Sequence, residues 1–354
     1  MNNKTLTAVW REGGEVMNVP KKRPGWRIGL WNKSRQIALI LLEFLWKWVI
    51  RFFYKPDFIF LVYGQERHKR ACWSKKRERK IGLLGLIGFI RWGDRRGLAI
   101  ASTVSMEEFR DNPARAVEVT NEAEKRFPNA QVFDLAGQLP GWIFRTSGQA
   151  VSKPFVGGNR GACFAVGKAI SEIVSSRFSG EENLCVAVVG GAGHTGSEMV
   201  NVLAANDCLR VIAFDPRLQE ETAGNIQRTS NPKFLGEASI VVALTAKGDD
   251  LKDLVPYIKS GAVVADDTHP MIGKKVRDSL SARGATLFKV TVADGRLKMW
   301  PRLPDFKPSD IPGCLLEALV VSVLKHEILA TQEMFNWGAD GLGFVPRLDK
   351  HPKY

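Results

Sequence analysis

The sequence predicts an α/β protein whose main domain is a doubly wound parallel sheet. Three observations support this prediction. Between residues 181 and 298, short apolar segments typical of buried strands alternate with helical patterns. The first of these strands runs directly into a glycine-rich turn and a helix, and the proline-rich residues 301–312 end the alternation. Strands separated by helices form right-handed crossovers, which place the strands parallel in one sheet.

The elements of this domain follow from the apolar segments in chain order. We expect five strands, at Leu184–Val189, Leu209–Phe214, Ile240–Leu244, Ala262–Ala265 and Thr286–Val290. A polar helix is expected after the second strand, and further helices over Leu251–Ile258 and Lys274–Ala282. This alternation is typical of a doubly wound domain.

A glycine-rich turn joins the first strand to the helix that follows it. Gly191, Gly193 and Gly196 fit the pattern G-x-G-x-x-G. In this pattern the first glycine allows the tight turn, the second lets the backbone approach a pyrophosphate, and the third lets the helix pack close to the strand. The helix N-terminus then offers free N–H groups to the anion. Strand, turn and helix together predict a Rossmann domain that binds a dinucleotide.

Two residues after the second strand bear on which dinucleotide is bound. Asp215 stands where an acidic residue commonly binds the ribose 2′-hydroxyl, which favours NAD. Arg217 is placed to bind a 2′-phosphate, which favours NADP. We also expect His194 and Thr195 at the pyrophosphate, and Thr245 at the cofactor because it ends the third strand.

Segments on both sides of the Rossmann domain are expected to form a second α/β domain. Before it come a strand and turn at Ile81–Ile90, a helix at Met106–Phe127, a strand at Ala130–Leu135 and a helix at Gly161–Phe178; after it comes an apolar helix at Cys314–Thr331. The predicted organisation is a basic helical extension over residues 1–80, a substrate domain over 81–180 and 299–354, and the Rossmann domain, 181–298, inserted between its two parts.

The cysteines bear on the compartment and on metal sites. There are five in 354 residues, scattered and without Cys-x-x-Cys spacing. This pattern disfavours a disulfide framework and a zinc site, so we expect a reducing compartment and no metal. Residues 1–16 are polar and carry charges of both signs, unlike a secretory signal. We therefore expect a cytoplasmic protein.

The positive charge is concentrated near the N-terminus. The net charge is +14, and residues 1–96 hold 22 Lys and Arg against 7 Asp and Glu, together with seven of the ten tryptophans. Residues 37–63 are mostly apolar, and we expect a helix there. The segment carries Glu43, Lys47, Arg51 and Lys55 at intervals of four, which leaves no span of about 18 apolar residues.

Two interpretations of this apolar segment remain open. A helix with a narrow cationic stripe between basic runs is typical of membrane-surface helices, and would hold the protein at the inner face of an anionic membrane. Alternatively, the helix packs on the protein's own core or at a subunit interface, with its cations reaching outward. We do not expect nucleic-acid binding, because the basic residues 69–80 come without a recognisable nucleic-acid-binding fold.

Five short motifs, taken together, resemble those of one enzyme family. They are Gly85–Gly88, Phe155–Asn159, Val186–Ser197, Asp266–Pro270 and Cys314–Ala318. In their order and approximate spacing, residues 81–354 are similar to the long-chain acyl-[acyl-carrier-protein] reductases of the cyanobacterial alkane pathway, whereas residues 1–80 have no counterpart. The resemblance implies NADPH-dependent reduction of a long-chain acyl thioester to a fatty aldehyde, through an acyl-cysteine. NADPH is therefore the cofactor we expect, with NADH as the alternative.

The resemblance also implies which residues would act. Cys314 stands at the nucleophile of the family's Cys-Phe-Ala-Glu-Ala stretch, and Gly158 and Asn159 stand in its Gly-Asn helix start, at the substrate. A helix N-terminus lowers the pKa of a thiol, which is compatible with a nucleophilic thiolate at Cys314. The alternative is a small buried cysteine in a helix. The acyl donor would be an acyl carrier protein or a coenzyme A thioester.

Two positions depart from the family's motifs. Phe89 stands where the family has a histidine, and His269 stands where it has a tyrosine. His269 would act as an acid or a polar anchor, or would only stabilise its turn. Two other functions remain open: a Rossmann dehydrogenase of a hydroxy or amino acid, and a non-enzymatic, membrane-associated dinucleotide-binding protein.

Overall fold

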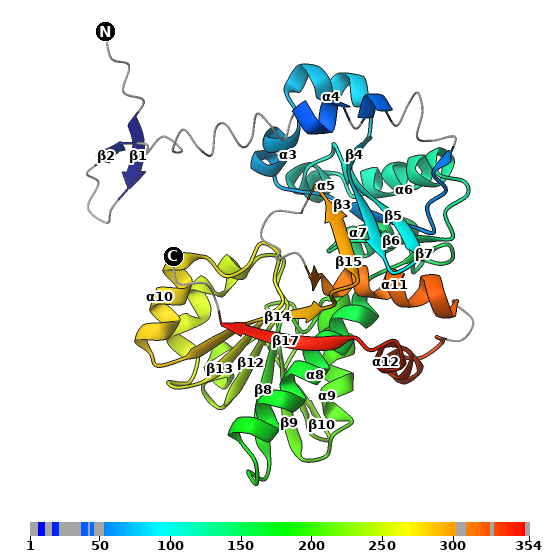
Figure 1. Cartoon of the computed structure of the whole chain (residues 1–354). Coiled ribbons are helices and arrows are strands. Elements are labelled where there is room, and N and C mark those ends of the chain that lie inside the picture. The colour runs from blue at the N-terminus through cyan, green and yellow to red at the C-terminus, as the bar shows by residue number, and fades with distance from the viewer. Residues whose placement is uncertain are drawn as a thin grey trace.

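The computed structural model describes residues 6–10, 16–20, 37–41, 43–45, 53–301, 309–325 and 329–350. Two α/β units, each built on its own sheet, make up most of this structure (Figure 1). Near the N-terminus, β1 (Leu6–Trp10) pairs antiparallel with β2 (Val16–Pro20). Among the described residues, no helix is both long and apolar enough to cross a membrane.

The larger sheet is the doubly wound sheet that the sequence predicts. Its parallel strands are β8 (Leu184–Val189), β9 (Leu209–Phe214), β11 (Ile226–Thr229), β12 (Ile240–Ala243), β13 (Val263–Asp266) and β14 (Thr286–Ala293). They are ordered β11-β9-β8-β12-β13-β14. This is the strand order of a Rossmann fold, with the switch point between β8 and β12. The predicted fold class is confirmed.

Antiparallel strands complete the two edges of this sheet. β10 (Glu221–Ala223) pairs with β11, while β16 (Asp310–Ile311) and β17 (Val345–Lys350) pair with β14. The residues after 298 were expected to belong only to the substrate domain as helices. That expectation is wrong for β16 and β17, because their pairing with β14 makes them part of the Rossmann sheet.

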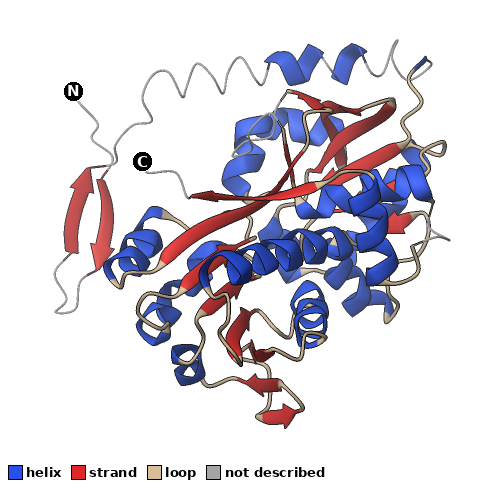
Figure 2. Ribbon diagram, turned by 60° about the horizontal axis from the view of Figure 1, so that its bottom comes forward, coloured by secondary structure: helices blue, strands red, loops and turns tan. Residues whose placement is uncertain are grey.

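The two faces of the Rossmann sheet have separate hydrophobic cores. Val186 and Val188 of β8 belong to one core, and Ala187 and Val189 belong to the other, because successive side chains of a strand point to opposite faces. Helices α8 (Asn159–Arg177) and α9 (His194–Ala204) cover the first face. The 3-10 helices η2 (Pro232–Gly236) and η3 (Gly248–Tyr257), with α10 (Lys274–Ala282), cover the second. Figure 2 shows helices, in blue, packed against the strands, in red.

The smaller sheet belongs to the unit expected to bind substrate. Its strands are ordered β15 (Leu297–Trp300), β4 (Leu84–Trp92), β5 (Arg95–Ser102), β3 (Phe58–Val62), β6 (Val132–Leu135) and β7 (Phe155–Val156). Helices α5 (Met106–Asp111), α6 (Ala114–Arg126) and α7 (Leu139–Ser147) lie in the same unit. Helix α11 (Gly313–Leu324) packs against β3, β6 and α8, between the two sheets (Figure 1), and α12 (Gln332–Gly341) packs against α8 and α11.

Several expected helices take another form. The β10–β11 hairpin replaces the polar helix expected after β9; its turn contains Gly224 at φ +60°, and the hairpin adds β11 to the sheet. Pro256 and Pro113 lack the N–H that a continuous α-helix requires. The helix expected over Met106–Phe127 is divided at Pro113 into α5 and α6, and the helix expected over Leu251–Ile258 is a 3-10 helix, η3, with Pro256 near its end. The helix expected to reach Thr331 ends at Leu324, and residues 326–328 lie outside the described residues.

The boundary expected at residue 80 is wrong, as is the apolar helix expected through Tyr63. Phe58–Val62 forms β3, which pairs with β5 and β6 in the middle of the smaller sheet. A run of five apolar residues fits a strand as well as a helix, and pairing on both sides decides for the strand. Helices α3 (Glu66–Cys72) and α4 (Lys75–Ile81) then lead directly into β4.

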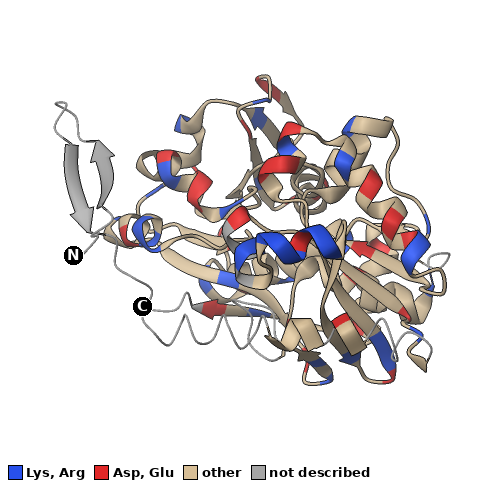
Figure 3. Cartoon of the chain, turned by 90° about the horizontal axis from the view of Figure 1, so that it is seen from above, with Lys and Arg blue, Asp and Glu red and all other residues tan. Residues whose placement is uncertain are grey.

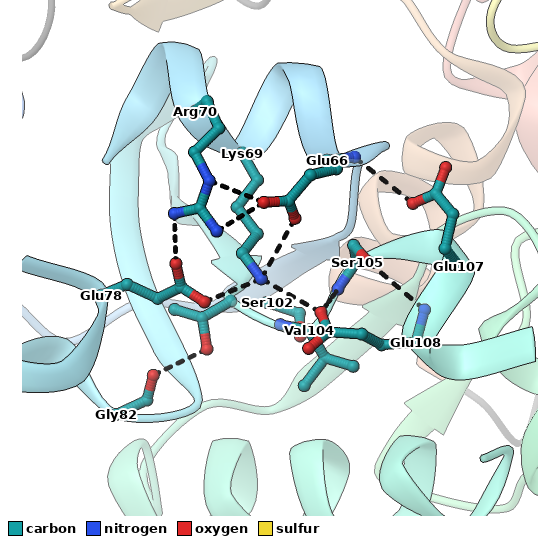
Figure 4. Close-up of polar contacts among 11 residues, drawn as sticks. Glu66, Lys69, Arg70, Glu78, Gly82, Ser102, Val104, Ser105, Glu107 and Glu108 are labelled. Carbon is teal, nitrogen blue, oxygen red and sulfur yellow. Dashed lines mark hydrogen bonds and ion pairs between the residues drawn. The ribbon is translucent and has the colours of Figure 1, made fainter. Parts of the chain in front are cut away.

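Ion pairs around Lys69 hold α3 and α4 on the body (Figure 4). Lys69 Nζ lies 2.7 Å from Glu78 of α4, 3.0 Å from Glu108 of α5 and 3.5 Å from Glu66. Arg70 binds both Glu66 and Glu78 at 2.5 Å. Burial alone would lower the pKa of Lys69, but its hydrogen bonds to Glu78 and Glu108 raise it overall. The buried ammonium therefore stays charged.

Candidate active site

The glycine turn lies at the carboxyl end of β8, beside the switch point. Its left-handed residue is Gly190, with φ +96°, one position before the expected tight-turn residue Gly191. The N–H groups of Gly190 and Gly191 both donate to the carbonyl oxygen of Phe214, at 2.9 and 3.0 Å. A Cβ atom at Gly190 would lie only 2.8 Å from the carbonyl oxygen of Leu244. Thr245 follows at once, and its hydroxyl donates to a backbone carbonyl two residues further on, at 2.9 Å.

The other two glycines of the motif set the start of α9. Gly193 is the N-cap residue and has no side chain to cap the helix. A side chain at Gly196 would overlap the carbonyl oxygen of Gly190, so this position needs glycine for the close approach expected of it. The first amides of α9, at His194, Thr195 and Gly196, have no acceptor within the helix. They are therefore available to phosphate oxygens, and the turn fits a dinucleotide.

Asp215 and Arg217 form an ion pair just beyond β9. Arg217 Nε and Nη2 donate to the two carboxylate oxygens of Asp215, at 2.8 and 2.9 Å. The N–H of Ala192, in the glycine turn, also donates to Asp215. Burial alone would raise the pKa of Asp215, but the hydrogen bonds and charge of Arg217 lower it overall. Because the Asp215 side chain is buried and that of Arg217 is 68% exposed, the pair presents its guanidinium to a ligand.

The loop after β13 is held from two sides. Asp266, which is buried at the end of β13, accepts three hydrogen bonds from the loop at 2.5 to 3.0 Å, two of them from Thr268. Lys289 of β14 is also buried, and its Nζ donates to the carbonyl oxygen of Thr268 at 3.0 Å. The loop is thus fixed, and Asp267 and His269 have set positions at the carboxyl edge of the sheet.

Asp267, His269 and Cys314 lie close to other protein atoms, although each reaches solvent. His269 is exposed and the other two are partly exposed, yet burial is the main cause of the pKa shift of each. The charge of Asp267 raises the pKa of Cys314, so these two groups lie within electrostatic range of each other.

The environment of His269 bears on the acid role expected of it. Burial lowers the pKa of its imidazole to about 3, with the nearby Lys289 acting in the same direction and Asp266 in the opposite one. The imidazole is therefore neutral near pH 7, where a proton donor would need the imidazolium. This environment favours the polar anchor over the acid.

Cys314 opens α11 and lies against the start of α8. Gly158 has φ +73°, and a Cβ atom there would lie 2.5 Å from Cβ of Cys314 and 3.3 Å from Oδ1 of Asp134. Asp134, in β6, is fully buried, and neither of its carboxylate oxygens has a hydrogen-bond partner among the described residues. The structure thus brings the predicted Gly158 and Cys314 together, and it adds a buried carboxyl group beside them.

The charges around Cys314 oppose a thiolate. Burial raises the pKa of Cys314 well above its usual value, and the charges of Asp134 and Asp267 raise it further. Hydrogen bonds from the N–H groups of Leu315 and of Cys314 itself act in the opposite direction, as expected at a helix start, but they do not outweigh the burial. The lowered pKa expected for Cys314 is therefore wrong. The resting side chain is a thiol, which needs a base in order to react.

Asn159 and Glu317 join α8 to its two neighbouring helices. Nδ2 of Asn159 donates to a carboxylate oxygen of Glu198 in α9. Glu317, buried one turn after Cys314, accepts from the backbone N–H of Arg160 at 3.0 Å, and burial raises its pKa to about 7. Asn159 therefore fixes α8 against the Rossmann helix α9, and its contact with substrate stays a prediction.

Asp134, Asp267 and Glu317, the acidic residues near Cys314, were not predicted as site residues. Asp134 and Glu317 are single acids within apolar segments, and Asp267 follows the structural Asp266. The sequence did offer a signal for Asp134, because it is an acidic residue within an apolar strand and carboxylates are rarely buried without a partner or a function.

Comparison with known proteins shows distant structural likeness. No protein-family model and no curated protein matches the sequence. Among solved structures, shikimate dehydrogenase from Aquifex aeolicus is 13% identical over 80% of this chain and 97% of its own, with a TM-score of 0.38. L-tryptophan dehydrogenase from Nostoc punctiforme is 14% identical over 81% of this chain and 80% of its own, with a TM-score of 0.37.

A further solved structure matches a smaller part of the chain. A D-isomer specific 2-hydroxyacid dehydrogenase from Xanthobacter autotrophicus Py2, in complex with NADPH and MES, is 17% identical over 37% of this chain and 66% of its own, with a TM-score of 0.26. Similarities this low concern the fold alone. The Rossmann assignment therefore rests on the strand order of this chain.

Proposed function

We propose that this chain is an NAD(P)H-dependent oxidoreductase that reduces an acyl thioester to an aldehyde through an acyl group carried on Cys314. One observation carries the proposal: Cys314 lies beside Gly158 with the buried Asp134 as a near neighbour, and within electrostatic range of Asp267 at the carboxyl edge of the Rossmann sheet. Ligands of doubly wound sheets bind at that edge. A nucleophile placed there faces both a substrate and a dinucleotide.

The glycine turn would hold the dinucleotide, which supplies a hydride when bound. The amides of His194, Thr195 and Gly196 would bind its pyrophosphate. We propose NADPH over NADH, because the carboxylate of Asp215 is already occupied by Arg217, whereas the guanidinium is exposed. An exposed guanidinium can form charge-assisted hydrogen bonds with a 2′-phosphate.

Asp134 is the group best placed to activate Cys314. Burial and the charge of Glu317 raise the pKa of Asp134 well above its usual value, which makes its carboxylate a stronger base. Asp134 would accept the thiol proton while the sulfur attacks the thioester carbonyl carbon. The bond to the leaving thiol then breaks, and that thiol takes the proton. Hydride and a proton next convert the acyl-cysteine to aldehyde and restore the Cys314 thiol.

The carboxyl groups near Cys314 restrict the substrates that fit. Asp134, Asp267 and Glu317 contribute carboxyl groups to this region, and burial raises the pKa of each; that of Asp267 rises to about 7. Such a site disfavours a substrate whose only charge is a carboxylate at the reacting carbon, as in a 2-hydroxy acid. The neutral carbonyl and alkyl chain of a thioester carry no such penalty.

One observation favours a second function, an amino-acid dehydrogenase. Asp134 has no hydrogen-bond partner among the described residues, and a buried carboxylate of this kind would bind the ammonium group of an amino acid. In that case Cys314 would only pack against Gly158, and substitution of the cysteine would leave the hydride transfer intact.

Acyl transfer without cofactor distinguishes the two functions. The full chain is incubated with a long-chain acyl-coenzyme A or acyl-carrier-protein thioester, and the acylated residue is located by mass spectrometry. We expect acylation of Cys314, and aldehyde only after NADPH or NADH is added. Cys208→Ser is the matched control, because Cys208 is an exposed free thiol. Aldehyde formation by Cys314→Ser at the native rate would refute the mechanism, and amino-acid oxidation by that variant would establish the second function.

A further inference from the structure

The helical segment formed by residues 37–41 and 43–45 points its charged residue inward and its apolar residues outward, the reverse of an ordinary surface helix. Its charged residue Glu43 points inward and is only 5% exposed. The Glu43 carboxylate accepts from the backbone N–H of Leu86 at 3.1 Å and from Nη2 of Arg126 at 2.9 Å. Leu39, one turn earlier on the same face, is also buried. The side of the segment that carries Glu43 and Leu39 therefore anchors it to the smaller sheet and to α6.

The outward side of the segment is apolar. Its exposed side chains, with their exposed fractions, are Ile37 at 58%, Ile40 at 41%, Leu41 at 56%, Phe44 at 60% and Leu45 at 44%, and Phe53 at 81% follows. Surface helices normally bury such residues and expose the charged ones. Of the four charged residues spaced by four, Glu43 is buried and Lys55 is exposed, and Lys47 and Arg51 lie outside the described residues. A contiguous exposed apolar face marks an interaction surface.

A basic helix, α4, lies near this segment. Glu43 accepts from the N–H of Leu86 in β4, the strand into which α4 leads directly, and Arg77 of α4 lies within electrostatic range of Glu43. Most of the remaining charges of α4 are exposed cations: Lys75, Lys76, Arg79 and Lys80. The one acid of α4, Glu78, is bound to Lys69 and Arg70 (Figure 4). Figure 3, seen from the α4 end of the molecule, shows Lys and Arg gathered on a helix in front.

We infer that the apolar side of residues 37–45, together with α4, is a docking surface for an anionic lipid bilayer. Aliphatic and aromatic side chains would enter the boundary between headgroups and acyl chains, while the lysines and arginines of α4 bind anionic headgroups. An acidic protein partner would satisfy the cations but would leave Leu41 and Phe44 exposed to water. Because the segment is fixed by Glu43, the whole body would lie on the membrane in one orientation.

Sedimentation of the full chain with lipid vesicles tests this inference. The probes are vesicles of phosphatidylcholine alone and of phosphatidylcholine mixed with phosphatidylglycerol. We expect binding to the mixed vesicles that weakens with salt. The double variant Leu41→Ser, Phe44→Ser should bind about tenfold more weakly because it loses buried apolar area. The double variant Lys76→Glu, Arg79→Glu should also bind about tenfold more weakly, but only to the vesicles that contain phosphatidylglycerol.

A matched control distinguishes binding through this surface from nonspecific adsorption to the vesicles. Trp337 of α12 is 76% exposed, and Trp337→Ser should bind vesicles as the native chain does. All the substituted side chains are exposed, so circular dichroism and the unfolding temperature should not change. Failure of the native chain to bind anionic vesicles would overturn the inference, as would equal binding by Leu41→Ser, Phe44→Ser. A native dimer that this double variant converts to a monomer would assign the face to a second copy of the chain instead.

Discussion

Asp134 and Cys314 meet at Gly158: one added carbon at the glycine would lie 3.3 Å from the carboxylate oxygen of Asp134 and 2.5 Å from Cβ of the cysteine. The two residues come from β6 and α11, which are far apart in the sequence and on opposite sides of the Rossmann strands in chain order. Their shared position at Gly158 brings an unpartnered carboxyl group close to a thiol that needs a base. The proposed chemistry depends on this pair.

Asp134→Asn should abolish the base without harming the fold. We expect Cys314 acylation to slow by about 10²–10⁴-fold, the usual contribution of a positioned base. Stability should be unchanged or higher, since an unpartnered buried carboxylate is unfavourable. Single-turnover acylation and thermal unfolding measure the two effects, with the exposed Asp278→Asn as control. In the native chain acylation should accelerate as pH rises, because the pKa of Asp134 is raised and its carboxyl group must be ionised before it can accept the thiol proton. Acylation of Asp134→Asn at the native rate would remove Asp134 from the mechanism.

Gly158→Ala should displace Cys314. The alanine would adopt an unfavourable positive φ and would also collide with the cysteine, so we expect a loss of about 2–4 kcal/mol in stability and slow acylation. Gly148→Ala is the matched control. Gly148 has φ +70° and no atom within 4 Å of an added Cβ, so it reports backbone strain alone. Equal stability losses and normal acylation in both variants would show that Gly158 does not place the cysteine.

Arg217→Ser should change the preference between the two dinucleotides. Loss of the guanidinium should weaken NADPH binding by about 10–100-fold, the worth of a charge-assisted hydrogen bond, and leave NADH nearly unaffected. Titration calorimetry with both dinucleotides measures this change. Arg228→Ser, which removes a surface ion pair with Glu221, is the control. If Arg217→Ser weakens both dinucleotides equally, the proposed 2′-phosphate contact is wrong.

Lys69→Met should loosen α3 and α4 from the body. We expect a loss of about 1–3 kcal/mol, less than the ~3–5 kcal/mol of a fully buried pair, because Glu78 and Glu108 are partly exposed. Hydrogen bonds from Lys69 help to hold the pKa of both glutamates below 4.5, although burial opposes this. Their stabilisation is therefore complete above pH 4.5 and is lost on acidification through the lowered values.

Chemical unfolding at pH 7 and pH 3 measures this contribution. The difference between Lys69→Met and the native chain should shrink at pH 3. Lys168→Met, at an exposed pair with Asp340, should cost about 1 kcal/mol or less at either pH. A pH-independent difference at Lys69 would assign the effect to packing and not to the ion pairs.

Truncation should locate the boundary of the folded body. A chain that lacks residues 1–80 loses β3 from the middle of the smaller sheet, and we expect it to aggregate or remain unfolded. A chain that lacks residues 1–36 keeps β3 and Glu43, and should unfold cooperatively near the native temperature. Expression of both chains and their melting curves give the comparison. A soluble, cooperative chain without residues 1–80 would contradict the central place of β3.

The Rossmann unit was predictable because its determinants are local. β8 and β9 match the expected bounds, since each is an apolar run ended by a turn, and the glycines are adjacent in sequence. The smaller unit was harder to predict. β3 pairs only with β5 and β6, which are distant in sequence, so nothing local distinguishes the Phe58–Val62 run from part of a helix. The same limit applies to β17, whose partner is β14.

The sequence alone determined the doubly wound sheet, the glycine turn with its free amides, and the presence of a cysteine at a helix start, because each depends on residues within one or two turns of chain. Only the tertiary structure decided the direction in which the pKa of that cysteine shifts. A helix start lowers a thiol's pKa, but burial and the carboxylates of Asp134 and Asp267 raise it more strongly. Those groups come from other strands, and the balance of charge and solvent around Cys314 exists only once both sheets are packed against α11.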